Sequence, residues 1–335
     1  MTKDTDLKNI EFEDVECLIC KTASHRVKLF SARDLLTGLP GSFSICRCEK
    51  CGLVFQSPRP KERYIHLFYP DDLGYFTAQS KGMPLLEKIE QTVLTNYYGY
   101  PGKKSIFDKI ATYAFYAYIY KSRSIPNYRK NGALLEIGCS NGTKLESLKK
   151  LGWKTTGIEL NKKAAKTAIE KGLDVWIGSI HDFDFPKESF DVIILDMVLE
   201  HLYAPDKALE KLTGWLKKDG QLIFSIPYFD GVEFRIFKEY SYGLQLPTHI
   251  TFFNKRAIQH LLQQNFSAIS YAFHHFDRDI IASAQYKYDA TGSALHRFIS
   301  RNKFFRTLII RPVLFILSML GKTSRVTVFA RKRSD

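Results

Sequence analysis

The chain has 335 residues, of which 45% are hydrophobic and 25% are charged, so it is long enough to bury a large core. This composition excludes a disordered or fibrous chain. The 49 basic and 35 acidic residues give a net charge of +14, which favours an anionic partner without identifying it.

The first residues, Met1 to Asp6, are polar and no apolar segment follows them, so the sequence predicts no secretory signal. The sequence contains no clean run of about eighteen apolar residues, so it predicts no membrane span. We therefore expect a cytoplasmic protein whose cysteines stay reduced.

Five of the six cysteines lie in the first part of the chain, and four of them form two C-x-x-C pairs. The pairs are Cys17 with Cys20 and Cys48 with Cys51. Each pair offers two thiolates from one tight turn, and four thiolates complete a tetrahedron around Zn²⁺. We predict a closed, structural zinc site that contributes to the folding of a zinc-ribbon-like module over residues 1–60.

The other candidate ligands in this module are weaker. Cys46 lies two residues before the second pair, so it is either spare or competes with Cys48. We expect His25 to be a surface loop residue. Free thiols or disulfides are the alternative to zinc for the whole set.

Residues 61–130 carry many aromatic side chains, and two stretches have helical spacing of apolar residues, near Leu85–Tyr97 and near Ile106–Lys121. We predict a helical cap that packs over the edge of the next domain. A lid that shields cofactor and acceptor from water is a compatible role, and the aromatic segment Tyr69–Phe76 is the candidate for it.

Residues 133–143 read A-L-L-E-I-G-C-S-N-G-T, which predicts a strand, a tight turn and the start of a helix. Gly138 and Gly142 allow a sharp bend and a close approach to a ligand, and the helix directs free N–H groups into the same crevice. A dinucleotide turn would read G-x-G-x-x-G, whereas this one reads Glu136-x-Gly-x-x-x-Gly. The next strand ends at Glu159, about twenty residues later, where an acid suits a ribose diol.

These motifs resemble those of the class I S-adenosylmethionine (SAM) methyltransferases of the type 11/12/23-like group. The family's first motif is acid-x-Gly-x-Gly-x-Gly, and Ser140 stands where the middle glycine usually is. The resemblance implies SAM as cofactor, backbone contacts from Gly138, Ser140 and Gly142 beside Glu136, and Glu159 on the ribose. An ordinary Rossmann-like turn without a ligand is the alternative.

From about residue 132 the sequence alternates strands with helices, which predicts a parallel sheet. The resemblance implies an α/β, Rossmann-like fold with a seven-stranded, mostly parallel sheet over residues 131–335. It also implies that Ser179 and Ile180, after the third strand, face adenine. Ser179 occupies the place of the usual acid, and Asp182 could supply the polar contact instead.

The fourth strand, residues 190–195, is a nearly continuous apolar run that leads to Asp196, which we expect beside the methionine moiety of SAM. Some ubiquinone-pathway O-methyltransferases hold a metal here with Glu-x-x-Glu-His. In this chain Met197 takes the first of these positions and is a poor ligand for Mg²⁺, so we predict no catalytic metal. Glu200 is expected to be a helix-start residue and His201 a substrate contact.

A loop of about twenty residues without strong periodicity, Tyr228–Gln245, is predicted after the fifth strand, at the sheet edge where acceptors dock. It leads to P-T-H-I-T-F-F, which resembles a segment of sugar methyltransferases that also carry an N-terminal four-cysteine zinc module. In C-methylating members a Glu precedes the His, whereas Thr248 does so here, which favours O- or N-methylation. His249 is the predicted general base, and a structural His bonded to a loop carbonyl is the alternative.

Between about residues 290 and 322 basic residues interrupt a dense apolar sequence before the last strand. The sequence is too broken to span a bilayer. It is expected either to pack as an ordinary insertion or to lie, as a basic amphipathic segment, on an anionic membrane surface at the inner face of the membrane.

The sequence thus predicts a SAM-dependent methyltransferase that acts on a small-molecule or glycan-type acceptor. An rRNA or tRNA methyltransferase is one alternative, because some of these join a four-cysteine module to a SAM domain. Nucleic acid is less favoured as a partner, because the cysteine module shows no basic stripe with interleaved stacking aromatics. A SAM-binding protein without catalysis is the other alternative.

Overall fold

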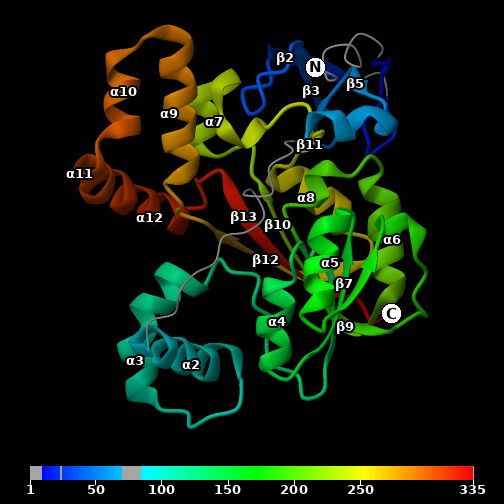
Figure 1. Ribbon diagram of the computed structural model, residues 1–335, viewed down its shortest axis with the longest axis vertical. Coiled ribbons are helices and arrows are strands. Elements are labelled where there is room, and N and C mark those ends of the chain that lie inside the picture. The colour runs from blue at the N-terminus through cyan, green and yellow to red at the C-terminus, as the bar shows by residue number, and fades with distance from the viewer. Residues whose placement is uncertain (1–9, 23–24, 70–83, 335) are drawn as a thin grey trace.

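The computed structural model describes residues 10–22, 25–69 and 84–334, and its centre is a seven-stranded sheet (Figure 1). The strands are β6 (Ala133–Ile137), β7 (Lys154–Glu159), β8 (Asp174–Ile177), β9 (Phe190–Asp196), β10 (Leu216–Pro227), β12 (Phe266–Phe273) and β13 (Arg325–Lys332). Their order is β12-β13-β10-β9-β6-β7-β8. Strand β13 is antiparallel to both neighbours, and all other neighbours are parallel. The predicted Rossmann-like, mostly parallel sheet is confirmed.

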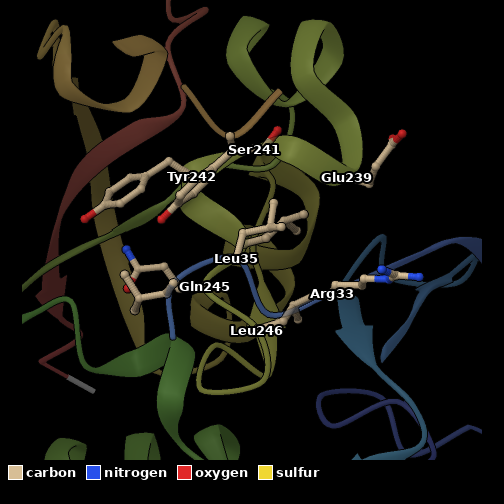
Figure 2. Close-up of a pocket in the computed structure, with 10 residues that line it drawn as sticks. Arg33, Leu35, Glu239, Ser241, Tyr242, Gln245 and Leu246 are labelled. Atoms are coloured by element: carbon tan, nitrogen blue, oxygen red, sulfur yellow. The ribbon is translucent and has the colours of Figure 1, made fainter. Parts of the chain in front are cut away.

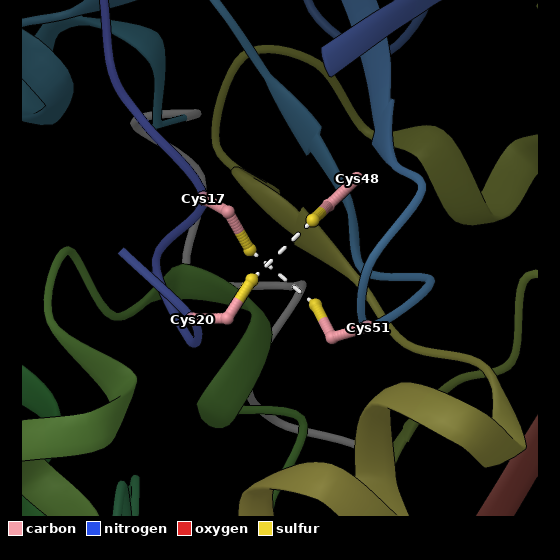
Figure 3. A group of neighbouring side chains, drawn as sticks. All are labelled: Cys17, Cys20, Cys48 and Cys51. Atoms are coloured by element: carbon pink, nitrogen blue, oxygen red, sulfur yellow. Dashed lines mark hydrogen bonds between the residues drawn. The ribbon is translucent and has the colours of Figure 1, made fainter. Parts of the chain in front are cut away.

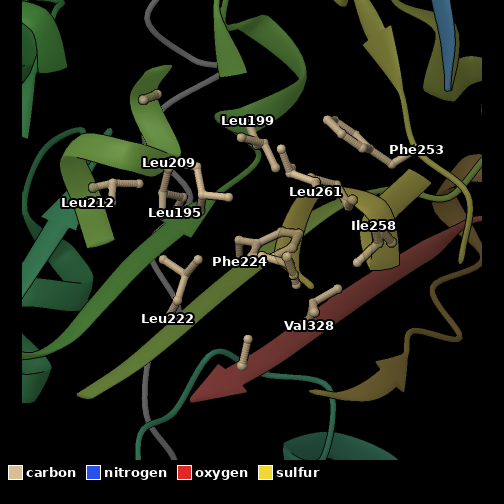
Figure 4. Packing of buried hydrophobic residues seen from close by; sticks show 14 of the residues in the cluster. Leu195, Leu199, Leu209, Leu212, Leu222, Phe224, Phe253, Ile258, Leu261 and Val328 are labelled. Atoms are coloured by element: carbon tan, nitrogen blue, oxygen red, sulfur yellow. The ribbon is translucent and has the colours of Figure 1, made fainter. Parts of the chain in front are cut away.

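Alternating side chains of each strand enter two different cores, as the two-residue period of a strand requires. In β9, Ile193 and Leu195 pack with α6 (Pro205–Trp215) and α8 (Lys255–Leu262) (Figure 4). Ile194, on the other face, packs with the remaining sheet-covering helices. These are α2 (Pro84–Tyr98), α4 (Thr143–Lys150) and α5 (Lys162–Glu170).

The strand order reverses between β6 and β9, because the chain runs outward in both directions from this pair. Such a switch point leaves a crevice at the carboxyl ends of the strands, where open α/β sheets bind their ligands. Both strands deliver predicted site residues to this edge, since β6 leads to Gly138 and β9 ends at Asp196.

The N-terminal part forms a second, antiparallel sheet with the order β11-β4-β3-β2. Its strands are β2 (Arg26–Ala32), β3 (Phe43–Cys48), β4 (Val54–Gln56) and β11 (Thr251–Phe252), and β1 (Phe12–Glu13) pairs with β5 (Arg59–Pro60) nearby. Strand β11 comes from the segment that precedes α8, far along the chain. Asn254 adds to this joint, because its Nδ2 donates to the Gly52 carbonyl at 2.8 Å. The cysteine module is therefore completed by the larger domain.

The segment expected to be an irregular loop, Tyr228–Gln245, contains regular structure. It forms α7 (Val232–Phe237) and two short 3-10 turns, Lys238–Tyr240 and Tyr242–Leu244. Phe234 and Leu244 pack into a core shared with the N-terminal sheet. The helix has six residues, which is too short for a clear 3.6-residue pattern in the sequence.

The two predicted cap helices are present as α2 and α3 (Ile106–Phe115), the second continued by a π-helical turn, Tyr116–Tyr120. Val93 and Leu94 of α2 are buried against the sheet. Of the candidate lid Tyr69–Phe76, only Tyr69 lies within the described residues.

The C-terminal insertion between β12 and β13 is helical. It comprises α9 (Arg278–Thr291), α10 (Ala294–Arg301), α11 (Lys303–Phe305), a π-helical turn (Arg306–Ile310) and α12 (Arg311–Met319). Asp277 anchors it, because its carboxylate pairs with Arg306 and with Arg311 at 2.6 Å. Within the described part of the chain, no helix combines the length and the apolar character needed to cross a membrane.

Candidate active site and cysteine cluster

The turn after β6 has the left-handed backbone that its glycines permit. Gly138, Ser140 and Gly142 have φ values of +72°, +51° and +74°. A Cβ on Gly138 would lie 2.6 Å from Val198 Cγ2, and one on Gly142 would lie 2.4 Å from Leu173 Cδ1. Both glycines are thus required by conformation and by crowding.

Glu159 fastens this turn to the end of β7. One carboxylate oxygen accepts from the Ser140 backbone N–H at 2.7 Å, and the other accepts from the Asn161 N–H, also at 2.7 Å. The next turn of the sheet also meets this point, because the Gly178 N–H donates to the Glu159 carbonyl at 3.0 Å. Glu159, the residue predicted to bind the ribose, therefore lies where three segments of the carboxyl edge meet.

Glu136 is buried beside this turn, and its Oε2 has no hydrogen-bond partner among the described residues. Burial raises its pKa to about 7, opposed by the Lys144 charge and reinforced by the Glu159 charge. The two carboxylates thus share one crevice. A buried polar atom without a partner is costly, so a cationic or N–H-bearing ligand fits this place.

Lys144 and Ser124 are two residues of the site that sequence reasoning missed. The Lys144 ammonium pairs with Asp196 and lies 4.0 Å from Glu136 Oε1, and burial lowers its pKa. Ser124, from the segment after the cap helices, donates to the other Asp196 oxygen. One signal was present in the sequence, because a lysine in the first turn of a helix opposes the helix dipole unless an acid holds it.

The turn after β8 places the predicted adenine contacts as follows. Ile180 is buried, whereas the Ser179 N–H donates to Asp182 Oδ2 at 2.7 Å. The Ser179 hydroxyl accepts from the His181 N–H at 3.3 Å. Asp182 and Ser179 thus cap the turn reciprocally, and their role toward adenine stays a prediction.

His201 and His249 come from segments far apart in the chain and lie together, with ring centroids 4.6 Å apart. Nδ1 of His201 is 2.9 Å from the Thr248 carbonyl, and Nδ1 of His249 is 2.9 Å from the Gly243 carbonyl. A carbonyl only accepts, so each Nδ1 carries the proton and each Nε2 keeps a lone pair. Burial lowers the pKa of both rings, that of His201 to about 4, so both are neutral at pH 7.

Glu200 lies beside the two histidines. As expected of a helix-start residue, it lies in the first turn of a 3-10 helix, Leu199–His201. This helix is separate from α6, which begins at Pro205, and Glu200 is fully buried in it. Among the described residues neither of its carboxylate oxygens has a hydrogen-bond partner, and burial raises its pKa to about 8. The donor atoms of Glu200, His201 and His249 lie within 4.8 Å of one another. One carboxylate and two imidazoles is a donor set that suits Zn²⁺ or Fe²⁺, so these three residues could hold a metal.

A shallow pocket adjoins the loop that carries His249 (Figure 2). Its walls come from the segment after β2, including Leu35, and from the turns that include Tyr242 and Gln245. The same loop shapes the His249 backbone, whose N–H donates to the Gln245 carbonyl at 3.1 Å.

The four predicted zinc ligands converge on one point (Figure 3). The sulfur atoms of Cys17 and Cys51 are 3.4 Å apart, and so are those of Cys20 and Cys48. These distances are too long for a disulfide, about 2.05 Å, and close to the edge of a zinc–thiolate tetrahedron, about 3.8 Å. The hydrogen bond between Cys17 and Cys51 lowers the pKa of the Cys17 thiol and raises that of Cys51, so the two sulfur atoms share one proton. The four residues therefore fit Zn²⁺.

Cys46 lies outside this cluster, since its sulfur is 3.6 Å from the Ser57 carbonyl. Cys46 is therefore a spare cysteine and does not compete with Cys48 for the metal.

Comparison with known proteins gives consistent results. The family described as "Methyltransferase domain" matches residues 111–267. An uncharacterised protein of Methanocaldococcus jannaschii is 32% identical over 112 residues, which cover 32% of this chain and 52% of that protein. A ubiquinone biosynthesis O-methyltransferase of Actinobacillus pleuropneumoniae serotype 7 is 33% identical over 103 residues, covering 28% of this chain and 44% of that protein. The chain thus spans about half the length of the curated relatives it matches.

Among solved structures, an S-adenosylmethionine-dependent methyltransferase from Mesorhizobium loti has a TM-score of 0.40 at 13% identity. The match covers 60% of this chain and 91% of that one.

Proposed function

We propose that this chain, which carries a class I SAM-dependent methyltransferase domain, transfers the methyl group of SAM to an oxygen or nitrogen atom of a small-molecule or glycan-type acceptor. One observation carries the proposal. The turn from Gly138 to Gly142 is fastened by the Glu159 carboxylate next to Glu136, a buried acid with an unpartnered oxygen. This arrangement fits a cationic nucleoside whose sugar hydroxyls reach Glu159.

Different residues would hold different parts of SAM. Backbone groups of Gly138, Ser140 and Gly142 approach it closely, and Glu159 accepts from its ribose hydroxyls. Asp196 lies toward the methionine moiety, and its carboxylate is already paired with an ammonium, that of Lys144. When bound, SAM supplies a sulfonium-activated methyl group, so the protein chiefly aligns the acceptor and excludes water.

The two histidines supply a place for the acceptor proton. The lone pair on Nε2 of His249 would accept the proton that the acceptor oxygen or nitrogen loses on methylation. The demethylated form of SAM is S-adenosylhomocysteine (SAH). His201 is half-buried and His249 is 1% exposed, so an incoming acceptor meets His201 first and His201 orients it. Tyr69 already contacts this side, with its hydroxyl 3.1 Å from Nδ1 of His201.

Thr248, the residue before the proposed base, favours methylation of oxygen or nitrogen over methylation of carbon. Thr248 is buried, and its hydroxyl donates to the Gln245 carbonyl at 2.8 Å. This position therefore offers no carboxylate to withdraw a proton from carbon. The ubiquinone O-methyltransferases among the relatives agree with an oxygen acceptor.

The test uses the purified full chain and SAM with a labelled methyl group, offered to pooled phenols, amines, sugar nucleotides and RNA. We expect label in a small-molecule or glycan pool, and His249→Asn should lower kcat about 10²- to 10⁴-fold with the affinity for SAH unchanged. Label in RNA with salt-sensitive binding would support the nucleic-acid alternative. SAH binding without turnover on any pool would overturn catalysis, and equal kcat in His249→Asn would remove this residue from the role of base.

A further inference from the structure

The helices at the β12 edge of the sheet turn apolar side chains outward, which reverses the usual arrangement of an amphipathic helix. On α3, Ile106, Phe107, Ile110 and Tyr113 are 60–81% exposed and are separated by one, three and three residues. Exposed apolar patches of this kind mark interaction sites.

A second stripe lies on the C-terminal insertion. Ile309, Val313, Ile316 and Leu320 are separated by four, three and four residues and are 48–65% exposed. In Figure 1, α10, α11 and α12 lie at the upper left and α2 and α3 at the lower left, so both groups are on the β12 half of the molecule.

The two stripes belong to one surface, which we call the edge face. Tyr118, in the turn that continues α3, lies with its ring 5.3 Å from that of Phe315 in α12. Both rings also contact His275, at the end of β12, at 4.3 and 5.4 Å. The edge face therefore joins two segments almost two hundred residues apart at the carboxyl edge of the sheet.

Basic residues are interleaved with the apolar ones across the edge face. Residues 294–322 contain six Lys or Arg and no Asp or Glu, and residues 101–123 contain five Lys or Arg and one acid, Asp108. Two of the six, Arg306 and Arg311, pair with Asp277. Arg297, Arg301 and Lys303 are exposed. Long basic side chains between apolar ones suit a bilayer interface, where the stems enter the apolar region and the charges reach phosphate groups.

We propose that the edge face docks on an anionic lipid bilayer. Helices α10 and α12 have eight and nine residues and are thus about 12–14 Å long, so they lie in the interfacial region of a bilayer about 30 Å thick. A second copy of the chain fits less well, because a twofold interface would place two faces with excess positive charge against each other. The proposal goes beyond the methyl transfer proposed above and does not depend on it.

The test is sedimentation of the full chain with vesicles, without SAM or acceptor. We expect binding to vesicles that contain about one-third phosphatidylglycerol, at least tenfold weaker binding to phosphatidylcholine alone, and loss of binding in high salt. Val313→Asp with Ile316→Asp, and separately Phe107→Asp with Ile110→Asp, should each weaken binding at least tenfold with unchanged Tm.

Two further variants test whether the loss of vesicle binding is specific to the edge face and whether binding depends on its basic residues. Ile169→Asp, at a 43% exposed site on α5 near the opposite edge of the sheet, should bind like the parent chain. Arg297→Glu with Lys303→Glu should weaken binding to the anionic vesicles only. Absence of binding to any vesicle, or full binding by both Asp pairs, would overturn the proposal. A dimer of the parent chain that the Asp pairs convert to monomer, without vesicle binding, would assign the edge face to self-association instead.

Discussion

The substitution Glu159→Gln tests the cofactor site most directly. The carboxylate accepts two backbone N–H groups at 2.7 Å, from Ser140 and Asn161. Glutamine keeps one acceptor oxygen and presents an NH₂ group where the second was, so one N–H loses its partner. A hydrogen bond to a charged group contributes about 1.5–3 kcal/mol, and the ribose loses a charged acceptor as well. We expect SAH to bind about 10- to 100-fold more weakly, which corresponds to about 1.4–2.8 kcal/mol.

The assay is calorimetric titration of the zinc-loaded chain with SAH. Glu146→Gln is the matched control, because Glu146 is a partly exposed acid on α4 that pairs only with Lys150 in the ion pairs of the described chain, at 2.7 Å. This control should leave the affinity unchanged. An unchanged dissociation constant in a folded Glu159→Gln variant would refute the placement of the ribose, and an equal loss in the control would show that the effect is nonspecific.

Three other changes test the remaining parts. Cys48→Ser should abolish bound zinc, measured by atomic emission, and lower Tm, whereas Cys46→Ser should retain the metal; zinc retained by Cys48→Ser would contradict the assignment. Lys144→Met should destabilise the free protein by about 2 kcal/mol in urea. It should also enlarge the gain in Tm caused by SAM, because the cationic ligand then supplies the missing positive charge; a smaller gain would argue against this. His274 is buried, and burial lowers its pKa to about 3, whereas its pKa in the unfolded chain is about 6.5. The unfolded chain therefore binds the proton first, and the free energy of unfolding falls as the pH drops from about 6.5 to about 3. His274→Gln should flatten that slope by up to about 1.4 kcal/mol per pH unit in urea titrations, and parallel slopes would exclude His274 as the cause.

The parts of the site that the sequence predicts are those with a local cause. Gly138 and Gly142 are needed for backbone reasons within one turn, and Glu159 follows from the length of a strand–helix–strand unit. The two C-x-x-C pairs likewise define two tight turns. Each of these signals lies within one turn or one strand–helix–strand unit, so the sequence alone displays it.

The parts that sequence reasoning missed depend on contacts between distant segments. Glu200 is buried because the segment with His249 packs over it, and the Ile250 N–H donates to the Glu200 carbonyl at 3.0 Å. Lys144 pairs with an acid that another strand supplies. Helix α7 is stabilised by aromatic packing against the N-terminal sheet and not by its own periodicity.

The cap helices and the reacting edge of the sheet are connected by a short, anchored segment. The Ser122 carbonyl accepts from the Thr327 hydroxyl at 2.6 Å, and two residues later Ser124 donates to Asp196. Thr327 also bonds to Ser225 at 2.7 Å, so β13, β10 and β9 all take part. Only five residues lie between Tyr118 of the edge face and Ser124. Because the Ser122 carbonyl and the Ser124 hydroxyl are both held by these hydrogen bonds, the chain that follows α3 is fixed beside the Asp196 carboxylate and is not a loose linker.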